Sequence, residues 1–284
     1  MITILEAIKL STEYLEKKGV ESPRVNAEIL LTKVLQSRRL DLYLSFDKPL
    51  GESEITVYRE MIRKRGMRIP LQYILGYVEF FGIKLKVDES VLIPRPETEL
   101  LVENIIADVK DKGKLKILDI GVGSGNISLA LLMNLPDVSI TGIDISSKAL
   151  ETARINSITH SLENRIDLIQ FDILSDNINT LGKFDIVVSN PPYVSKIDYS
   201  VLEPELKNYE PSEALTDNSD GYSFYDAIIC KSKGLWNKPG KIYFEFAQGQ
   251  SEAIKNKLTE NSFSNIYIKK DLAGTDRVIC GEIK

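Results

Sequence analysis

The sequence predicts an α/β protein in which a small helical bundle precedes a mostly parallel sheet with helices on both of its faces. Two patterns support this prediction. Apolar residues in the first 75 positions recur at helical spacing, and beyond Lys114 short apolar runs rich in β-branched residues alternate with helix-like segments. Because 284 residues exceed the usual size of one domain, two domains are expected.

The first 75 residues are expected to contain three helices, at about 4–19, 22–35 and 52–65. The first ends in two lysines and a glycine, which are typical of a helix C-terminus. The second opens with Ser22-Pro23, the pattern of an N-cap followed by proline in the first turn. Glycine and proline follow the third helix. Residues 1–75 therefore form the expected N-terminal domain.

Residues 76–95 are expected to form a β-hairpin linker, because aromatic and β-branched residues lead there into an alternation of apolar and polar positions. Residues 96–284 form the expected second domain. Its predicted helices lie at about 98–109, 126–135 and 147–157, and its predicted strands at about 115–120, 139–144, 167–171, 185–189, 241–246, 266–269 and 277–283.

The composition narrows the classes of function. The net charge is −5 and the isoelectric point is near 5.3, whereas nucleic-acid-binding proteins usually carry a basic stripe or domain, so no direct nucleic-acid partner is expected. With one histidine, His160, and two separated cysteines, Cys230 and Cys280, no metal site is expected. The N-terminus lacks the pattern of a signal peptide and no membrane span is predicted, so a cytoplasmic protein without a membrane partner is expected.

A glycine-rich loop, Gly121-Val122-Gly123-Ser124-Gly125, lies between the first predicted strand of the sheet and the helix that follows it. Glycines let the backbone approach a ligand closely at a helix N-terminus, where doubly wound sheets bind nucleotides. Asp144 ends the next predicted strand and suits the hydroxyls of a ribose. Glycine stands at position 125 and not at 126, so the spacing matches S-adenosylmethionine-dependent methyltransferases better than NAD enzymes.

The tetrapeptide Asn190-Pro191-Pro192-Tyr193 follows an apolar strand directly. A strand that runs into two prolines must stop, because proline lacks the backbone N–H and restricts the residue before it. The stiff strand end then presents the Asn190 side-chain oxygen and nearby carbonyls as acceptors, and Tyr193 offers a flat face. This combination suits a planar NH2 group, either an amide or an exocyclic amine.

These motifs together resemble the HemK/PrmC family of protein glutamine methyltransferases, and the resemblance covers most of the chain. The Pro-Arg-Pro-Glu-Thr segment ahead of an Asn-Pro-Pro-Tyr strand end is its most specific part. The matching segments are Arg65-Gly66, 70–76, 79–82, 93–99, 119–125, 190–193, Glu210-Pro211, Ala214-Leu215, Asp220-Gly221 and 274–277.

The resemblance implies a Rossmann-like S-adenosylmethionine-dependent methyltransferase domain, with an N-terminal helical domain that docks class 1 peptide-chain release factors. The expected substrate is the glutamine of their Gly-Gly-Gln motif. The resemblance places the cofactor on the glycine loop, Asp144, Asn190, Asp172 and Ile173, although an ordinary loop aspartate fits Asp172 equally well. Val122 and Ile173 depart from common family residues, and a branched aliphatic at 173 can still cover one face of adenine.

The residues also suggest how the reaction is catalysed. An amide nitrogen is a poor nucleophile because its lone pair is shared with the carbonyl, so acceptors must orient it. We expect the Asn190 oxygen and the Pro191 carbonyl to accept the two amide hydrogens, while Pro192 and Tyr193 sandwich the planar amide. Whether Glu97, Thr98 or Glu245 contacts cofactor or substrate is left open by the sequence.

Three alternatives remain at this point. An N6-adenine methyltransferase uses the same kind of strand end on a flipped base, but the acidic net charge disfavours it. A glutamine methyltransferase that acts on a ribosomal protein fits the tetrapeptide as well. A binding module without catalytic activity is disfavoured by the intact glycine loop, Asp144 and Asn190.

Overall fold

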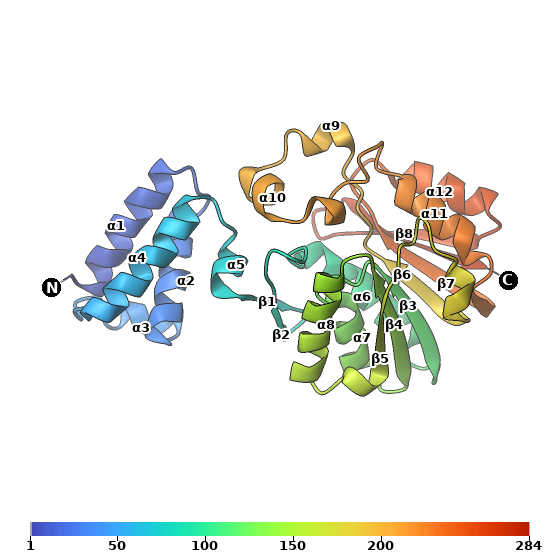
Figure 1. Ribbon diagram of the computed structural model, residues 1–284, viewed down its shortest axis with the longest axis horizontal. Coiled ribbons are helices and arrows are strands. Elements are labelled where there is room, and N and C mark those ends of the chain that lie inside the picture. The colour runs from blue at the N-terminus through green and yellow to red at the C-terminus, as the bar shows by residue number, and fades with distance from the viewer. Residues whose placement is uncertain (1, 284) are drawn as a thin grey trace. The chain divides into compact units, whose positions relative to one another are not determined.

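The computed structural model describes residues 2–283, and the chain divides into two compact units (Figure 1). The N-terminal unit consists of Met1–Tyr77 together with Glu203–Tyr209. The second unit, the C-terminal unit, consists of Val78–Leu202 and Glu210–Lys284. A short segment from the second half of the sequence therefore belongs to the N-terminal unit.

The N-terminal unit is a helical bundle, as predicted from the sequence. Its helices α1, α2 and α4 pack on one another around a shared apolar core (Figure 1). A capping box between Thr3 and Glu6 begins α1. The two five-residue helices, α3 and α5, were not predicted because so short a segment shows no periodicity. The bounds are α1 (Ile4–Lys17), α2 (Pro23–Leu35), α3 (Arg39–Tyr43), α4 (Glu52–Gly66) and α5 (Leu71–Leu75).

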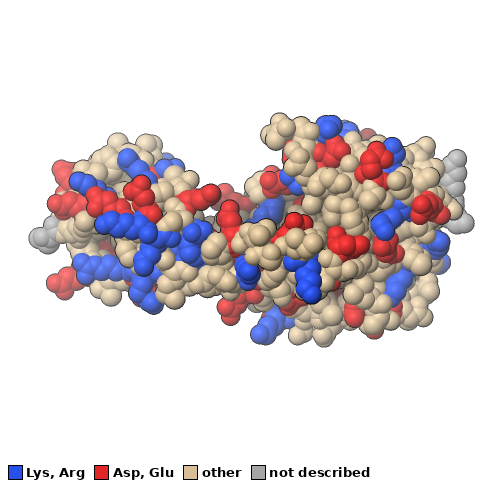
Figure 2. Space-filling model, turned by 90° about the horizontal axis from the view of Figure 1, so that it is seen from above, with Lys and Arg blue, Asp and Glu red and all other residues tan. Residues whose placement is uncertain are grey.

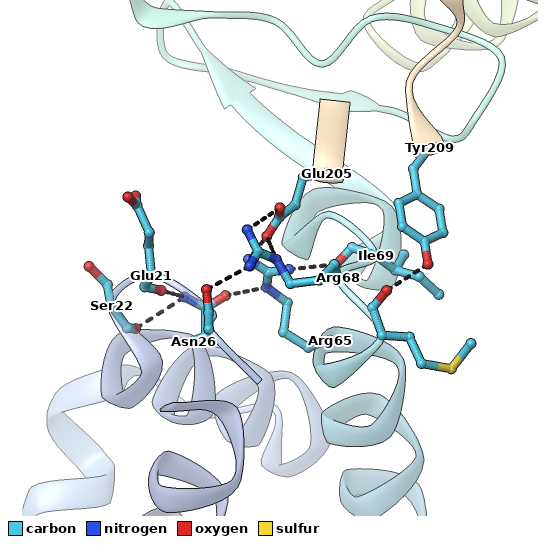
Figure 3. Close-up of polar contacts among 10 residues, drawn as sticks. Glu21, Ser22, Asn26, Arg65, Arg68, Ile69, Glu205 and Tyr209 are labelled. Atoms are coloured by element: carbon cyan, nitrogen blue, oxygen red, sulfur yellow. Dashed lines mark hydrogen bonds and ion pairs between the residues drawn. The ribbon is translucent and has the colours of Figure 1, made fainter. Parts of the chain in front are cut away.

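Helix α10 (Pro204–Tyr209) is held in the N-terminal unit by charged contacts (Figure 3). Glu205 forms ion pairs with Arg65 at 3.0 Å and with Arg68 at 2.5 Å, and the side chains of Glu205 and Arg65 are 12% and 8% exposed. Tyr209 donates a 2.6 Å hydrogen bond to a backbone carbonyl after α4. Charge-assisted hydrogen bonds of low exposure are stronger than surface ion pairs, so this cluster fixes α10.

We expect the substitution Glu205→Gln to loosen α10. It keeps the side-chain volume but removes the charge that both arginines face, which should lower the free energy of unfolding by about 1.5 kcal/mol. Limited proteolysis between residues 196 and 209, read beside thermal unfolding, measures the effect. The control is Glu203→Ala, since Glu203 is exposed in the same segment. Equal cleavage rates in the two variants would contradict a role of Glu205 in holding the helix.

Strands β1 (Tyr77–Phe80) and β2 (Ile83–Lys86) form the two-stranded sheet expected of the hairpin linker. Both turn residues, Phe81 and Gly82, have positive φ, which is the geometry of a two-residue hairpin loop. The buried Asn156 side chain bonds to both backbone groups of Lys86 and donates to the carbonyl of Ser124. One amide thus ties β2 to the glycine loop.

The C-terminal unit contains a seven-stranded sheet in the order β5-β4-β3-β6-β7-β9-β8, parallel except for the pairs made by β9. The chain runs from β3 to β4 on one side and places β6 on the other. This reversal of strand order is where doubly wound sheets bind ligands. The strands are β3 (Leu115–Ile120), β4 (Val138–Asp144), β5 (Ile166–Gln170), β6 (Phe184–Ser189), β7 (Trp236–Glu245), β8 (Ser264–Lys270) and β9 (Asp276–Ile283).

Successive residues of the central strands face two different apolar clusters. Ile117 packs in the cluster with α6 and α7, and Leu118 packs in the cluster with α11 and α12 (Figure 1). This confirms the predicted Rossmann-like α/β fold, although α9, α11 and α12 were not predicted. Among the described residues, no helix is long and apolar enough to cross a membrane. The helices are α6 (Pro96–Val109), α7 (Asn126–Asn134), α8 (Ser147–Thr159), α9 (Lys196–Tyr199), α11 (Ser223–Ser232) and α12 (Ser251–Glu260).

Candidate active site

A cavity of about 220 Å³ lies at the carboxyl ends of β3, β4 and β6. The glycine loop, the end of β4, the segment after β5 and the tetrapeptide all contribute to its walls. The sequence-predicted residues that line it are Gly121, Gly123, Ser124, Asp144, Asp172, Ile173, Asn190, Pro191 and Pro192. The structure therefore brings nearly all of the expected site residues together around one space.

The glycine loop has the backbone shape that only glycine adopts readily. Gly121, Gly123 and Gly125 have φ values of +77°, +53° and +84°. A Cβ built on Gly121 would meet no atom within 4 Å, so the space beside this residue is open. Val122 instead is buried, and its side chain packs against Gly142 of β4. Val122 can therefore serve a ligand only through its backbone.

Asp144 holds the glycine loop in place. Its Oδ2 accepts a 3.0 Å hydrogen bond from the amide of Gly123, and its Oδ1 accepts a 2.9 Å bond from the amide of Ser146. Burial raises the pKa of this carboxyl, and the two amides oppose that shift. Each carboxylate oxygen keeps a second lone pair, so Asp144 can still accept from a pair of hydroxyls.

Asp172 and Ile173 form the wall that follows β5. The Asp172 carboxylate accepts 2.8 Å hydrogen bonds from the amide of Leu174 and the hydroxyl of Ser175, so it stabilises its own turn. Ile173 is buried and lines the cavity. The sequence could not reveal the turn-capping use of the aspartate, because an aspartate in a ligand site and one in a turn look alike.

Asn190 meets Thr98 at the edge of the cavity. Its Nδ2 donates a 3.2 Å hydrogen bond to Oγ1 of Thr98, which is 1% exposed and also lines the cavity. Thr98 lies in the first turn of α6, whose start is fixed by Pro96. The side-chain nitrogen of Asn190 is thus committed to the protein, and Oδ1 remains as its acceptor.

Pro191 and Pro192 line the cavity, whereas Tyr193 packs in the apolar cluster that contains Tyr225. Burial raises the pKa of Tyr193, and its hydroxyl therefore stays protonated. The carbonyl of Tyr193 accepts from Nε2 of Gln250, and lies only 2.5 Å from where a Cβ on Gly221 would stand. Gln250 and Gly221 brace the tetrapeptide, and no motif in the sequence identified Gln250.

Glu210 fixes the proline-rich segment that precedes α6. Its carboxylate accepts a 3.1 Å hydrogen bond from the amide of Ile93 and pairs with the guanidinium of Arg95 at 2.5 Å. The side chain of Glu210 is 1% exposed. Glu210 therefore holds the Pro-Arg-Pro segment beside Glu210-Pro211, although 115 positions separate Glu210 from Arg95 in the sequence.

Asp119 ends up buried beneath the glycine loop, with one carboxylate oxygen accepting from Ser128 and the other without a partner among residues 2–283. Burial raises the pKa of Asp119 from 3.8 to about 7. The folded state then binds more protons than the unfolded state between these values, so the free energy of unfolding falls as the pH rises through that window.

We expect Asp119→Asn to remove the contribution of Asp119 to this decline. Urea unfolding at about pH 5 and about pH 8 should show a smaller loss of stability for the variant than for the wild type. Asp111→Asn, an exposed aspartate, serves as the control. An unchanged difference between the two pH values would show that Asp119 is charged in the folded protein.

In the part of the chain that the structure describes, no group of three or more His, Cys, Asp or Glu side chains is placed to hold a metal ion. The polar side chains among the lining residues carry hydroxyl, amide, carboxylate and guanidinium groups. Such groups suit hydrogen bonding to an organic ligand with several hydroxyls and amines.

Comparison with known proteins gives two family matches. The family described as PrmC N-terminal domain matches residues 6–76, and the family described as Methyltransferase small domain matches residues 96–205. The chain is 41% identical over 276 residues to a release factor glutamine methyltransferase of Fusobacterium nucleatum, covering 97% of this chain and 77% of the relative. It is 36% identical over 282 residues to that of Rhodopirellula baltica, covering 98% and 95%.

Solved structures support the fold alone. The hMettl16 catalytic domain, solved in complex with MAT2A 3'UTR hairpin 6, is 15% identical with a TM-score of 0.58, covering 78% of this chain and 81% of that one. A methyltransferase from Pyrococcus furiosus is 16% identical with a TM-score of 0.54, covering 71% and 89%. Both similarities extend over most of the chain, as expected for a shared methyltransferase fold.

Proposed function

Since the chain belongs to the release factor glutamine methyltransferases, we propose that Asn190 orients the glutamine of the Gly-Gly-Gln motif in class 1 peptide-chain release factors for methyl transfer. The protein is a methyltransferase that uses S-adenosylmethionine to modify a glutamine side chain. The proposal assigns each part of this reaction to particular residues.

The cavity fits S-adenosylmethionine in its chemistry. The open space beside Gly121 allows a ligand to approach the backbone, the free lone pairs of Asp144 suit the ribose hydroxyls, and the apolar Ile173 suits the face of adenine. When bound, S-adenosylmethionine supplies a methyl group on a positively charged sulfur that already activates it for transfer. The protein therefore has to bind, orient and exclude water.

The position of the Asn190 nitrogen is the observation that carries the proposal. Because Nδ2 donates to Thr98, Oδ1 is the part of this carboxamide available to accept from a substrate. An NH2 group has two hydrogens, and the carbonyl of Pro191 at the cavity edge is a second acceptor. Two fixed acceptors hold the amide in plane and stabilise the positive charge that develops on its nitrogen.

The rigid backbone of the tetrapeptide holds these two acceptors in place before the substrate binds. The two prolines restrict the backbone, Ser189 is tied to the carbonyl of Ile120 by a 2.7 Å hydrogen bond, and Gln250 holds the carbonyl of Tyr193. Acceptors that are in place before the substrate arrives cost no reorganisation during the reaction. Tyr193 then supports the loop from the apolar core, and an amide would lie against Pro192.

We propose the N-terminal unit as the docking domain for the release factor, with the reaction taking place in the cytoplasm, where translation ends. Residues 1–77 carry 13 Lys and Arg against 10 Asp and Glu, whereas the whole chain carries 36 against 41. Figure 2 shows basic and acidic side chains interspersed on the visible face of the molecule. A surface of mixed sign suits a protein partner better than a nucleic-acid backbone.

Two other substrates share the required NH2 group, namely a glutamine of a ribosomal protein and the N6 amine of adenine. Transfer of labelled methyl groups to a class 1 release factor, a ribosomal protein and an adenine-containing oligonucleotide, measured side by side, tests the assignment. We expect the release factor to have by far the highest kcat/KM. A higher value for either of the others would contradict the proposed substrate.

A further inference from the structure

Glu245 is a buried carboxyl directly behind the catalytic tetrapeptide. In the parallel register of β6 and β7, Ser189 pairs with Phe244, so the next residues, Asn190 and Glu245, leave the two strands at the same edge of the sheet. Glu245 is 1% exposed, and Tyr225 fixes its backbone by donating to its carbonyl at 2.8 Å. Burying a charged carboxylate costs free energy unless neighbouring groups donate hydrogen bonds to it or carry the opposite charge.

The surroundings of this carboxyl are the parts of the site that hold Asn190. The side chains of Thr98 and Asn190 lie close enough to this carboxyl to lower its pKa, and Oε2 has no hydrogen-bond partner among the described residues. Thr98 and Asn190 line the cavity, whereas Glu245 is absent from its walls. Glu245 therefore acts on the site through these two side chains and not by touching a ligand.

We propose that Glu245 is a positioning residue whose carboxylate, directly and through Thr98, holds the Nδ2 group of Asn190 inward so that Oδ1 faces the substrate. This inference rests on the proposed function, in which Oδ1 of Asn190 accepts a hydrogen from the glutamine amide.

The polarity of the hydrogen bonds supports this role. An ionised carboxylate can only accept, so in the proposed arrangement Thr98 donates its single hydroxyl hydrogen to Glu245. Oγ1 of Thr98 then has only lone pairs to offer to Asn190, which must present its NH2 group. The structure has this direction, with Nδ2 donating to Oγ1 at 3.2 Å.

Protonation of Glu245 would reverse the direction of the hydrogen bonds that join Asn190, Thr98 and Glu245. The neutral carboxyl can donate to Thr98, whose own hydrogen is then free to bond to Oδ1 of a flipped Asn190. The substrate would meet an NH2 group in place of an acceptor. The amide of a glutamine cannot donate to that group, so methyl transfer should require the ionised form of Glu245.

Several groups near Glu245 determine the pH at which its carboxyl ionises. Burial raises the pKa of Glu245 from 4.5 to about 7, Thr98, Arg277 and Asn190 oppose this shift, and Glu97 adds to it. The hydroxyls of Tyr193 and Tyr225 are also influenced by its charge but keep raised pKa values of their own. The carboxyl is thus set to change its charge close to neutral pH.

The pH dependence of single-turnover methylation of a release factor, at saturating cofactor, tests the proposal with Glu245→Gln. We expect the wild-type rate to rise about tenfold between about pH 6 and about pH 8, and the rate of the variant to be nearly flat over that range. The matched control is Asp119→Asn, because burial also raises the pKa of Asp119 to about 7. That variant should keep the wild-type rise, and a rise in Glu245→Gln equal to that of the wild type would overturn the proposal.

A second pair of variants decides the matter if Glu245→Gln does not fold. Thr98→Ser keeps the hydroxyl and should keep the rise of the rate with pH, whereas Thr98→Val removes the hydroxyl and should transfer methyl groups about tenfold more slowly than Thr98→Ser. Equal rates for these two variants would contradict the relay. If instead Asn190→Ala transfers methyl groups at the wild-type rate, the proposed role of Asn190 fails, and this outcome is distinct from a failure that concerns Glu245 alone.

Discussion

Replacing Asn190 by alanine is expected to slow methyl transfer by about 10²–10³. The substitution removes the Oδ1 acceptor that the structure leaves free at the cavity edge, because Nδ2 is already bonded to Thr98. Loss of one preorganised polar contact in a water-poor site has an effect of this size. Single-turnover methylation of a release factor, with cofactor binding measured separately, gives the rate of the chemical step.

Folding should be little affected by Asn190→Ala. The prolines and the pairing of β6 fix this part of the backbone without the side chain, and the lost hydrogen bond to Thr98 costs about 1 kcal/mol. Thermal unfolding beside the kinetics separates the two explanations. Near-normal turnover in a stable variant would remove Asn190 from the mechanism, and a collapsed variant would show that the residue serves the fold.

Replacing Asp144 by asparagine is expected to weaken the binding of S-adenosylmethionine by about 10- to 100-fold. The carboxylate has a free lone pair on each oxygen for the ribose hydroxyls, and a charge-assisted hydrogen bond contributes about 1.5–3 kcal/mol. Asparagine also places an NH2 group against one of the two backbone amides, Gly123 or Ser146, that the carboxylate now satisfies. Both effects act in the same direction.

Calorimetric titration with S-adenosylmethionine measures this change. Asp111→Asn makes the same chemical change at an exposed position and should bind as the wild type does. An unaltered affinity of a folded Asp144→Asn variant for S-adenosylmethionine would contradict the assignment of Asp144 to the ribose hydroxyls. Lower affinity together with a lower unfolding temperature in the absence of ligand would show that the loop contacts dominate.

Much of the fold could be predicted from the sequence because its signals are local. Apolar residues recur at helical spacing in α1 and α2, the central strands are short apolar runs, and the glycine loop stands between a strand and a helix. The missed elements are of two kinds. Helices α3, α5, α9 and α10 are too short for a period, while α11 and α12 have mixed patterns whose apolar faces are evident only against the sheet.

The site could be predicted as a set of residues but not as a network. Asn190, Asp144 and the glycines follow strand ends, where chemistry is expected in such sheets. Thr98 lies 92 positions before Asn190, and the sequence does not reveal that the two side chains meet. Likewise, the pairing of Glu205 with Arg65 across 140 positions depends on tertiary structure alone. Sequence motifs identify the residues of the site, whereas the packing of the folded chain determines which of their polar atoms remain free to bind a ligand.

Tandem mass spectrometry of a class 1 release factor, after incubation with S-adenosylmethionine carrying an isotopically labelled methyl group, tests the central claim most directly. We predict one label per chain, on the side-chain amide nitrogen of the glutamine in the Gly-Gly-Gln motif, and no label when Asn190→Ala replaces the wild-type enzyme over the same short incubation. A label on any other residue, or an equally labelled glutamine with the Asn190→Ala variant, would contradict the account.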